Sequence, residues 1–155
     1  MAPELDRLTR LEIRAALEDL NAAFARHLDG GDIDALVALF ADDALYTHGE
    51  RRSQGKAAIE ALFRRRAAAG PRTSRHLYSG LNIEIEDGDR ARGSSICLTF
   101  AADGAPPLPA KPFLVADFHD TYVCGADGVW RFQSRHIERI FVAADNPGPI
   151  GHAPR

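Results

Sequence analysis

The apolar residues of this chain follow a helical period up to Gly70-Pro71 and an alternating period after it. In the first part they recur mostly at steps of three or four, which predicts one long amphipathic helix carrying Leu5, Leu8, Ile13, Leu17, Leu20, Phe24 and Leu28. Gly30-Gly31 ends this helix, because glycine tolerates the left-handed conformation at a helix C-terminus. Two shorter helices follow, one capped by Asp32 and one that begins after Gly55, with a short strand over 44–48 between them.

Beyond Gly70-Pro71 the alternation predicts four long strands, over 75–86, 90–101, 112–124 and 129–142. The turns at 87–89 and 125–128 are of the hairpin type. Helices followed by a run of antiparallel strands are typical of the α+β class. A long bent sheet wrapped against three helices would leave a pocket between its concave face and the helices.

The chain has 155 residues and a formal net charge of −3. This length suits one domain with a substantial core, which we expect over residues 1–145. Residues 146–155 are rich in Pro and Gly and are expected either to be disordered or to lie across a neighbouring subunit. The charge offers no electrostatic footprint for a nucleic-acid partner, and we interpret Arg64-Arg65-Arg66 as a solvated helix face.

No apolar run approaches the roughly 20 residues of a membrane-spanning helix, and the N-terminus lacks the pattern of a signal peptide. We therefore expect a soluble cytoplasmic protein without a membrane partner, in which Cys97 and Cys124 are reduced core thiols. The chain has no Gly-rich phosphate loop, no paired-cysteine zinc motif and no His-Glu-x-x-His spacing. We expect neither a metal nor a cofactor.

Asp29 stands at the end of the first helix, directly before Gly30-Gly31. A carboxylate is unfavourable there, because the helix C-terminus carries partial negative charge. Such a position is either a solvated helix end or part of a site. The residues alone leave both interpretations open.

His76 lies near the start of the first long strand, and the side it faces depends on how regular that strand is. Strict alternation places His76 and Tyr78 opposite the apolar residues of the second half of the strand. A bulge at Ser79-Gly80 would add one residue and bring His76 and Tyr78 onto the inner face with them. The pattern favours neither alternative over the other.

Asp117 and His119 share one face of the third long strand, which is apolar on both faces and is therefore expected to be covered on both. Polar groups on a covered strand need partners, so the two residues either make structural hydrogen bonds or line a pocket, and we favour the pocket. Tyr46 and His48 share one face of the short strand. His136 is interpreted as structural or exposed.

Several short motifs resemble the SnoaL-like branch of the nuclear-transport-factor-2-like (cystatin-like) superfamily, near scytalone dehydratase and hexachlorocyclohexane dehydrochlorinase. The matching pieces run in unbroken order and are Leu28-Asp29-Gly30-Gly31-Asp32 with Leu36 and Leu39-Phe40, Asp42-Asp43-Ala44-Leu45-Tyr46, Gly55-Lys56-Ala57-Ala58-Ile59, Ser74-Arg75-His76, Asp87-Gly88-Asp89-Arg90-Ala91 and Asp127-Gly128-Val129-Trp130-Arg131-Phe132. The resemblance implies a cone-shaped barrel in which three N-terminal helices pack on a long, curved, mostly antiparallel sheet.

In both named enzymes an Asp at the end of the first long helix pairs with a His at the start of the first long strand. The resemblance implies that Asp29 and His76 form this pair, with His76 as the general base that removes a proton from carbon and Asp29 fixing its tautomer. Assisting polar residues of the dehydratase map most nearly to His48, Asp117 and His119, where the residue types differ. Relatives assemble through the outer face of the sheet, so we expect a homo-oligomer, a dimer or a trimer.

We therefore expect a cofactor-independent lyase or isomerase, dehydratase-like, that abstracts a proton from a small cyclic or aromatic-like hydrophobic substrate in an apolar cavity. The alternative is a non-catalytic small-molecule binding module or an accessory subunit such as a dioxygenase β subunit, since the fold alone does not determine function. The residues expected to bind the substrate are Phe40, Tyr46, His48, Tyr78, Leu98, Phe100, Val115, Asp117 and His119.

Overall fold

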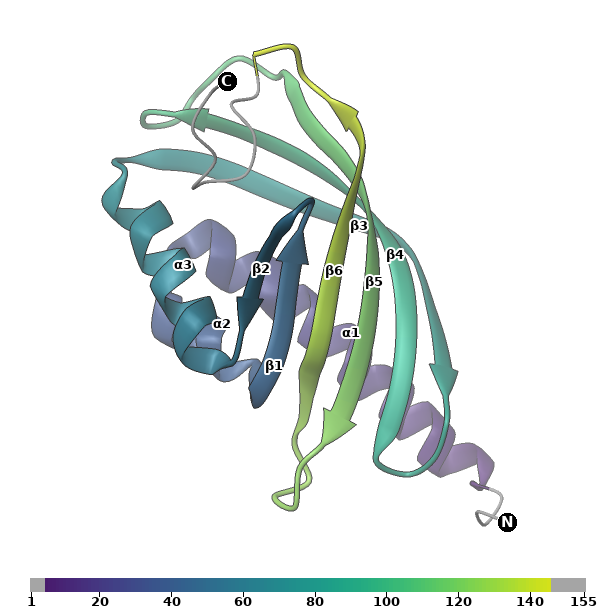
Figure 1. Cartoon of the computed structure of the whole chain (residues 1–155). Coiled ribbons are helices and arrows are strands. Elements are labelled where there is room, and N and C mark those ends of the chain that lie inside the picture. Colours follow the sequence, from purple (N-terminus) through teal and green to yellow (C-terminus); the bar gives the residue numbers. More distant parts are fainter. Residues whose placement is uncertain (1–4, 146–155) are drawn as a thin grey trace.

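The computed structural model describes residues 5–145, which form three helices and six strands (Figure 1). The helices are α1 (Arg7–Gly30), α2 (Ile33–Ala38) and α3 (Lys56–Ala68). The strands are β1 (Phe40–His48), β2 (Arg51–Gln54), β3 (Arg72–Ile85), β4 (Arg90–Asp103), β5 (Pro112–Cys124) and β6 (Trp130–Val142). No helix in this part of the chain is long and apolar enough to cross a membrane. The Pro- and Gly-rich tail lies outside the described residues, and the single domain over 1–145 stays a prediction.

The six strands form one sheet in the order β2-β1-β6-β5-β4-β3, and of its five strand pairings only β1–β6 is parallel. The sheet is strongly curved but does not close into a complete barrel (Figure 1). Helix α1 packs mainly against β3, whereas α3 packs against β1 and β2. The predicted α+β arrangement of three helices on a curved, mostly antiparallel sheet is confirmed.

The boundaries of two elements differ from the prediction. Strand β1 begins at Phe40, which the hydrophobic pattern places in the second helix, although α2 ends at Ala38. Strand β2 is not predicted by the sequence, because its four residues are polar and show no apolar alternation. It forms through pairing with β1, where Arg51 lies opposite His48.

Helix α1 is fixed on the sheet by the apolar stripe that the sequence predicts. Leu17 and Phe24 of this stripe are 0% and 1% exposed. The ring of Phe24 makes edge-to-face contacts with Phe40, Phe63 and Phe132, at centroid distances of 6.1, 6.4 and 5.8 Å. Such contacts stabilise the core beyond simple burial. The C-terminal end of α1 therefore has a defined position relative to the strands.

The predicted stop of α1 and the predicted cap of α2 are both present. Gly31 takes φ 73°, a left-handed conformation that glycine adopts at little cost, and its N–H donates to the carbonyl of Leu28. The side chain of Asp32 then accepts the N–H of Ala35 at 3.0 Å. The chain thus turns sharply just after Asp29.

A bulge in β3 decides which way His76 faces. The register between β3 and β4 shifts by one residue just after Ser79, and Gly80 takes φ 64° at that point. The extra residue changes the phase of the strand, so that His76 and Tyr78 face the same side as the buried Ile83. Of the two alternatives left open by the sequence, the bulge is confirmed.

A second bulge, in β6, turns Arg135 into the core. Regular alternation places Arg135 on the face opposite Phe132, yet both side chains are 0% exposed and lie on the same face. Gln133 is the additional residue that shifts the register, because Phe132 and Ser134 pair with consecutive residues of β5. The sequence pattern alone does not reveal this bulge, since Gln133 carries no turn signal.

The buried guanidinium of Arg135 is surrounded by partners. It pairs in bidentate fashion with Asp120, through Nε and Nη2 at 2.8 Å each, and both side chains are fully buried. It also donates to Asn21 and to the hydroxyl of Tyr78, and it lies 4.1 Å from the centroid of the Phe132 ring. A buried ion pair needs this full set of hydrogen bonds to offset its desolvation.

Candidate active site

Asp29, in the last turn of α1, holds His76 of β3 by two contacts. Its Oδ1 lies 2.6 Å from Nδ1 of His76, and its Oδ2 accepts the backbone N–H of His76 at 3.0 Å. The hydroxyl of Ser74 donates to Oδ1 at 2.7 Å. The side chains of His76 and Asp29 are 8% and 12% exposed. The structure thus brings together the two residues for which a catalytic role is predicted.

These contacts explain how an acid is tolerated at a helix C-terminus. Burial raises the pKa of Asp29, but the hydrogen bonds and charge of His76 and the hydrogen bond from Ser74 outweigh burial, so its pKa lies below the usual value. An ionised Asp29 accepts only from a protonated Nδ1, which fixes the tautomer of His76. The Nε2 atom of the neutral ring then keeps a free electron pair and can accept a proton.

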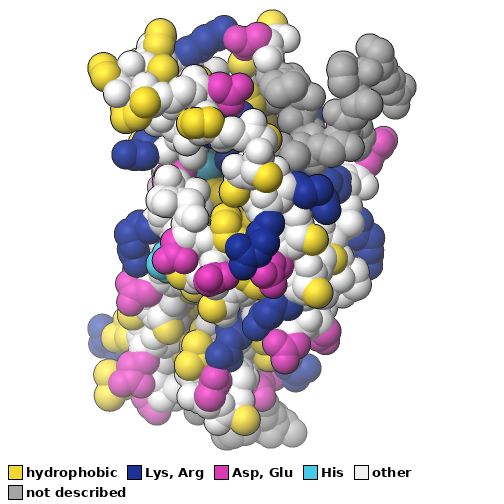
Figure 2. Space-filling view, turned by 90° about the vertical axis from the view of Figure 1, so that its left-hand side faces the viewer, with side chains coloured by type: hydrophobic (Ala, Val, Ile, Leu, Met, Phe, Trp, Pro, Cys, Tyr) yellow, Lys and Arg dark blue, Asp and Glu magenta, His cyan; other side chains and the backbone are white. Residues whose placement is uncertain are grey.

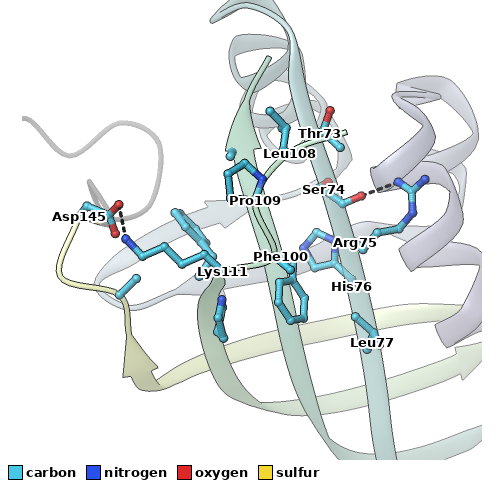
Figure 3. A pocket seen from close by; sticks show the side chains of 16 residues that line it. Thr73, Ser74, Arg75, His76, Leu77, Phe100, Leu108, Pro109, Lys111 and Asp145 are labelled. Atoms are coloured by element: carbon cyan, nitrogen blue, oxygen red, sulfur yellow. Dashed lines mark hydrogen bonds and ion pairs between the residues drawn. The ribbon is translucent and has the colours of Figure 1, made fainter. Parts of the chain in front are cut away.

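A pocket of about 640 Å³ borders His76 at the end of the sheet where the segment 104–111 connects β4 to β5 (Figure 3). Its walls are mainly apolar and include Leu77, Phe100, Leu108, Pro109, Pro112 and Phe113. Lys111 and Asp145, which form an ion pair of 2.9 Å, line it as well. A pocket of this size and character suits a small cyclic molecule.

Four of the expected binding residues face the helices but do not line this pocket. Phe40 is fully buried among the aromatic rings, and the hydroxyl of Tyr78 accepts a hydrogen bond from Arg135. Tyr46 and His48 lie on the inner face of β1, and Tyr46 is 4% exposed. Phe40 and Tyr78 therefore belong to the packed core, whereas His48 lies closer to the edge of the sheet beside β2.

Other expected binding residues lie on the outer face of the sheet. Leu98 and Val115 align with Leu77, which is 51% exposed, and Asp117 and His119 follow on the same face of β5. The structure therefore does not bring Asp117 or His119 to the Asp29–His76 pair. Both faces of β5 are apolar in sequence, so the pattern could not show which one meets the helices. Among the residues expected to bind the substrate, Phe100 does line the pocket beside His76.

Asp117, His119 and Glu138 form a cluster on the outer face, with ligand atoms that all lie within 4.8 Å of one another. His119 Nε2 is 3.5 Å from Glu138 Oε2, and the ring of His136 lies nearly parallel to that of His119. Side chains of these types can hold a divalent metal. However, His119 and Glu138 are 51% and 58% exposed, and exposed groups of this kind commonly form solvated charge pairs.

Two arginines beside Asp29 are not predicted by the sequence analysis. Arg66 and Arg72, with Asp29 and Ser74, line a second pocket of about 230 Å³ between the ends of α1 and α3 and the start of β3. Asp29 therefore lines the basic cavity, whereas its partner His76 lines the apolar pocket, and Ser74 borders both.

The interpretation of the arginine run on α3 as a solvated face is wrong for its last member. Arg64 is exposed and pairs with Glu60 and Asp34, and basic and acidic side chains are interspersed on this side of the molecule (Figure 2). Arg66 is half-buried instead. The helical period could have predicted this burial, because Arg66 lies one turn after the buried Phe63 and so continues the buried stripe of α3.

The family comparison agrees with the fold and with the resemblance in sequence. The SnoaL-like domain family matches residues 9–136. No curated protein is significantly similar to the chain in sequence. Among solved structures, a candidate scytalone dehydratase from Novosphingobium aromaticivorans has a TM-score of 0.77 at 23% identity, with 94% of this chain and 97% of that chain covered.

Two further solved structures share the fold. LinA, a hexachlorocyclohexane dehydrochlorinase, has a TM-score of 0.73 at 25% identity, with 96% of this chain and 98% of LinA covered. A protein of unknown function with a cystatin-like fold from Nostoc punctiforme PCC 73102 has a TM-score of 0.71 at 25% identity, with 88% and 95% covered. The chain belongs to the SnoaL-like domain family, with a cystatin-like fold.

Proposed function

We propose that the protein is a cofactor-independent lyase or isomerase, in which His76 removes a proton from a carbon atom of a small cyclic substrate. The observation that carries this proposal is the 2.6 Å contact between Asp29 Oδ1 and His76 Nδ1 beside a mainly apolar pocket of about 640 Å³. Membership of the SnoaL-like family supports the general class, and the residue roles rest on this geometry.

In the proposed step, the electron pair on Nε2 of His76 takes a proton from a carbon next to a carbonyl group. The electrons of the broken C–H bond move into the carbonyl to give an enolate, or expel a leaving group from the neighbouring carbon to give an alkene. The ring of His76 then carries a positive charge, which Asp29 stabilises through the Nδ1–H bond. An isomerase returns the proton at a second carbon, whereas a lyase releases the leaving group.

The proposal includes self-association through the outer face of the sheet. Leu77, Ile96 and Phe141 are 51%, 51% and 69% exposed there. Leu77, which also borders the pocket beside His76, aligns with Phe141 through Leu98 and Val115 across β3 to β6, so the covered face would reach the rim of that pocket. Exposed apolar patches of this kind mark interfaces. We propose that a second copy of the chain covers this face, in a dimer or a trimer. Light scattering that returns the mass of a single chain would contradict it.

The proposed reaction class can be tested by proton exchange in D₂O. The protein is incubated with a panel of cyclic ketones that includes 1-tetralone, 4-chromanone and 2-cyclohexenone, and deuterium next to the carbonyl is followed by NMR. We expect at least one member to exchange about 100-fold faster than in buffer, the lower end of what a positioned base contributes. Asp117→Asn, on the outer face, should exchange like the wild type. Ketones that bind but take up no deuterium would favour the non-catalytic binding module.

A further inference from the structure

Buried nitrogen atoms without hydrogen-bond partners gather in one part of the fold. Of the five such side-chain polar atoms within residues 5–145, four belong to three residues: Nε2 of His48, Nε and Nη1 of Arg51, and Nε of Arg72. The three arginine atoms are donors, the role of the His48 nitrogen depends on its tautomer, and unpaired buried polar atoms cost free energy and are rare in folded proteins. Several of them in one region indicate a ligand that supplies hydrogen-bond acceptors.

The side chains of the β1–β2 hairpin that carry these atoms face the interior. His48 and Arg51 are paired across the hairpin, so both side chains lie on the same face. Tyr46, two residues before His48, is 4% exposed and identifies this face as the inner one. Arg139 of β6 faces the same interior, because it lies opposite the fully buried Ala116 of β5.

Arg66 of α3 connects this hairpin with the Asp29–His76 pair. It lines the pocket of about 230 Å³ together with Arg72 and Asp29. Burial lowers the pKa of its guanidinium, and the neighbouring charges of Arg72 and Arg51 act in the same direction. Arg72 pairs with the exposed Asp103 through Nη1 at 3.5 Å, whereas no salt bridge to Arg51 or Arg66 is present within the described part of the chain.

The interior therefore carries an excess of positive charge. Burial lowers the pKa of His48 to about 4, and the charges of Arg51, Arg139 and Arg66 contribute, so its ring is neutral at physiological pH. The carboxylate of Asp29 already accepts hydrogen bonds from His76 and Ser74. Arg51 and Arg66 have no salt-bridge partner among the described residues, and guanidinium groups held near one another repel, so an anion between them removes this cost.

We infer that Arg51, Arg66, Arg72 and Arg139 form a binding site for an organic anion, a cyclic or aromatic molecule with a carboxylate, phenolate or enolate oxygen. We refer to these four residues as the arginine site. Guanidinium groups suit such oxygens because they donate several hydrogen bonds in a fixed plane. The catalytic role of this site rests on the proposed function. Proton removal next to a carbonyl places negative charge on the carbonyl oxygen, and guanidinium donors stabilise such a charge.

Matched ligands and matched variants test the arginine site without turnover. Benzoate and benzamide have nearly the same shape but differ in charge, and their binding is measured by calorimetry. Arg51→Gln and Arg66→Gln remove one guanidinium each. Their neighbours provide the controls, because Arg52 and Arg65 are exposed on the same elements. Circular dichroism identifies any variant that fails to fold. If either Arg51→Gln or Arg66→Gln fails to fold, the benzoate affinity of the other variant tests the inference.

The wild type should bind benzoate at least about tenfold more tightly than benzamide, and Arg51→Gln or Arg66→Gln should weaken benzoate binding about tenfold, as expected for one charge-assisted hydrogen bond. Arg52→Gln and Arg65→Gln should stay within about twofold of the wild type. Equal affinity for the two ligands, or unchanged benzoate affinity in both folded arginine variants, would overturn the inference. Benzoate binding without any catalysed exchange would refute the proposed function and leave the arginine site standing.

Discussion

Replacing His76 by Ala is expected to lower the rate of catalysed proton exchange by about 10³-fold, within the range that a positioned general base contributes. The variant removes the Nε2 atom that accepts the proton, while the residue lies at the border of a pocket and not among the buried aromatic rings. The fold should therefore persist. The measurement is deuterium uptake by the ketone that the wild type exchanges fastest, with circular dichroism as the check on folding.

Asp29→Asn separates the role of the acid from that of the base. If Asp29 acts by orienting His76, this variant should lower the rate, and the double variant should be no slower than His76→Ala alone, because residues that act as a unit give non-additive effects. A His76→Ala protein that keeps more than about a tenth of the wild-type rate would contradict the assignment of the base, since a tenfold loss is below the usual contribution of such a group.

Replacing Arg135 by Met should destabilise the protein by about 3–5 kcal/mol, the usual cost of removing one partner of a buried ion pair. The loss leaves Asp120 with a charge in a place that is fully closed to solvent. It also removes hydrogen bonds to Asn21 and to Tyr78. Urea unfolding followed by the fluorescence of Trp130, the single tryptophan of the chain, measures the change in the free energy of unfolding.

Arg131→Met, on the same strand, is the matched control. Arg131 pairs with Asp127 at 2.7 Å, but the two side chains are 27% and 52% exposed, so the loss should stay below about 1 kcal/mol. Adding Asp120→Leu to Arg135→Met should recover part of the lost stability, because no unpaired charge remains. A loss below about 1 kcal/mol for Arg135→Met would show that the buried ion pair does not hold the core together.

Features that depend on neighbours along the chain could be predicted from the sequence. The stripe of α1 and the glycine stop at Gly31 follow from helical periodicity and backbone freedom, and both are present. The two-residue motif Ser79-Gly80 raised the bulge in β3 as one of two alternatives. Strand β2 could not be predicted, because its polar residues become a strand only through their pairing with β1.

Features that depend on register between distant strands were harder to predict. Arg135 is buried because Gln133 shifts the register of β6, and nothing in the local pattern marks that residue. Asp120, on the apolar face of β5, is the sign of a buried charge that the sequence offers, whereas the predicted site residues Asp117 and His119 lie on the opposite face. The Asp29–His76 pair came from the resemblance to known enzymes, since 47 residues separate its members and no local pattern joins them.

The central claim is that Asp29 makes His76 a base by holding the proton on Nδ1, and the ¹⁵N chemical shifts of the His76 ring test it most directly. In its neutral form, the wild-type ring should show a protonated Nδ1 and an unprotonated Nε2. Asp29→Asn should lose this preference, because a neutral amide oxygen is a weaker acceptor than a carboxylate. A wild-type ring with its proton on Nε2 would contradict the account, since that atom could not then accept a proton from the substrate.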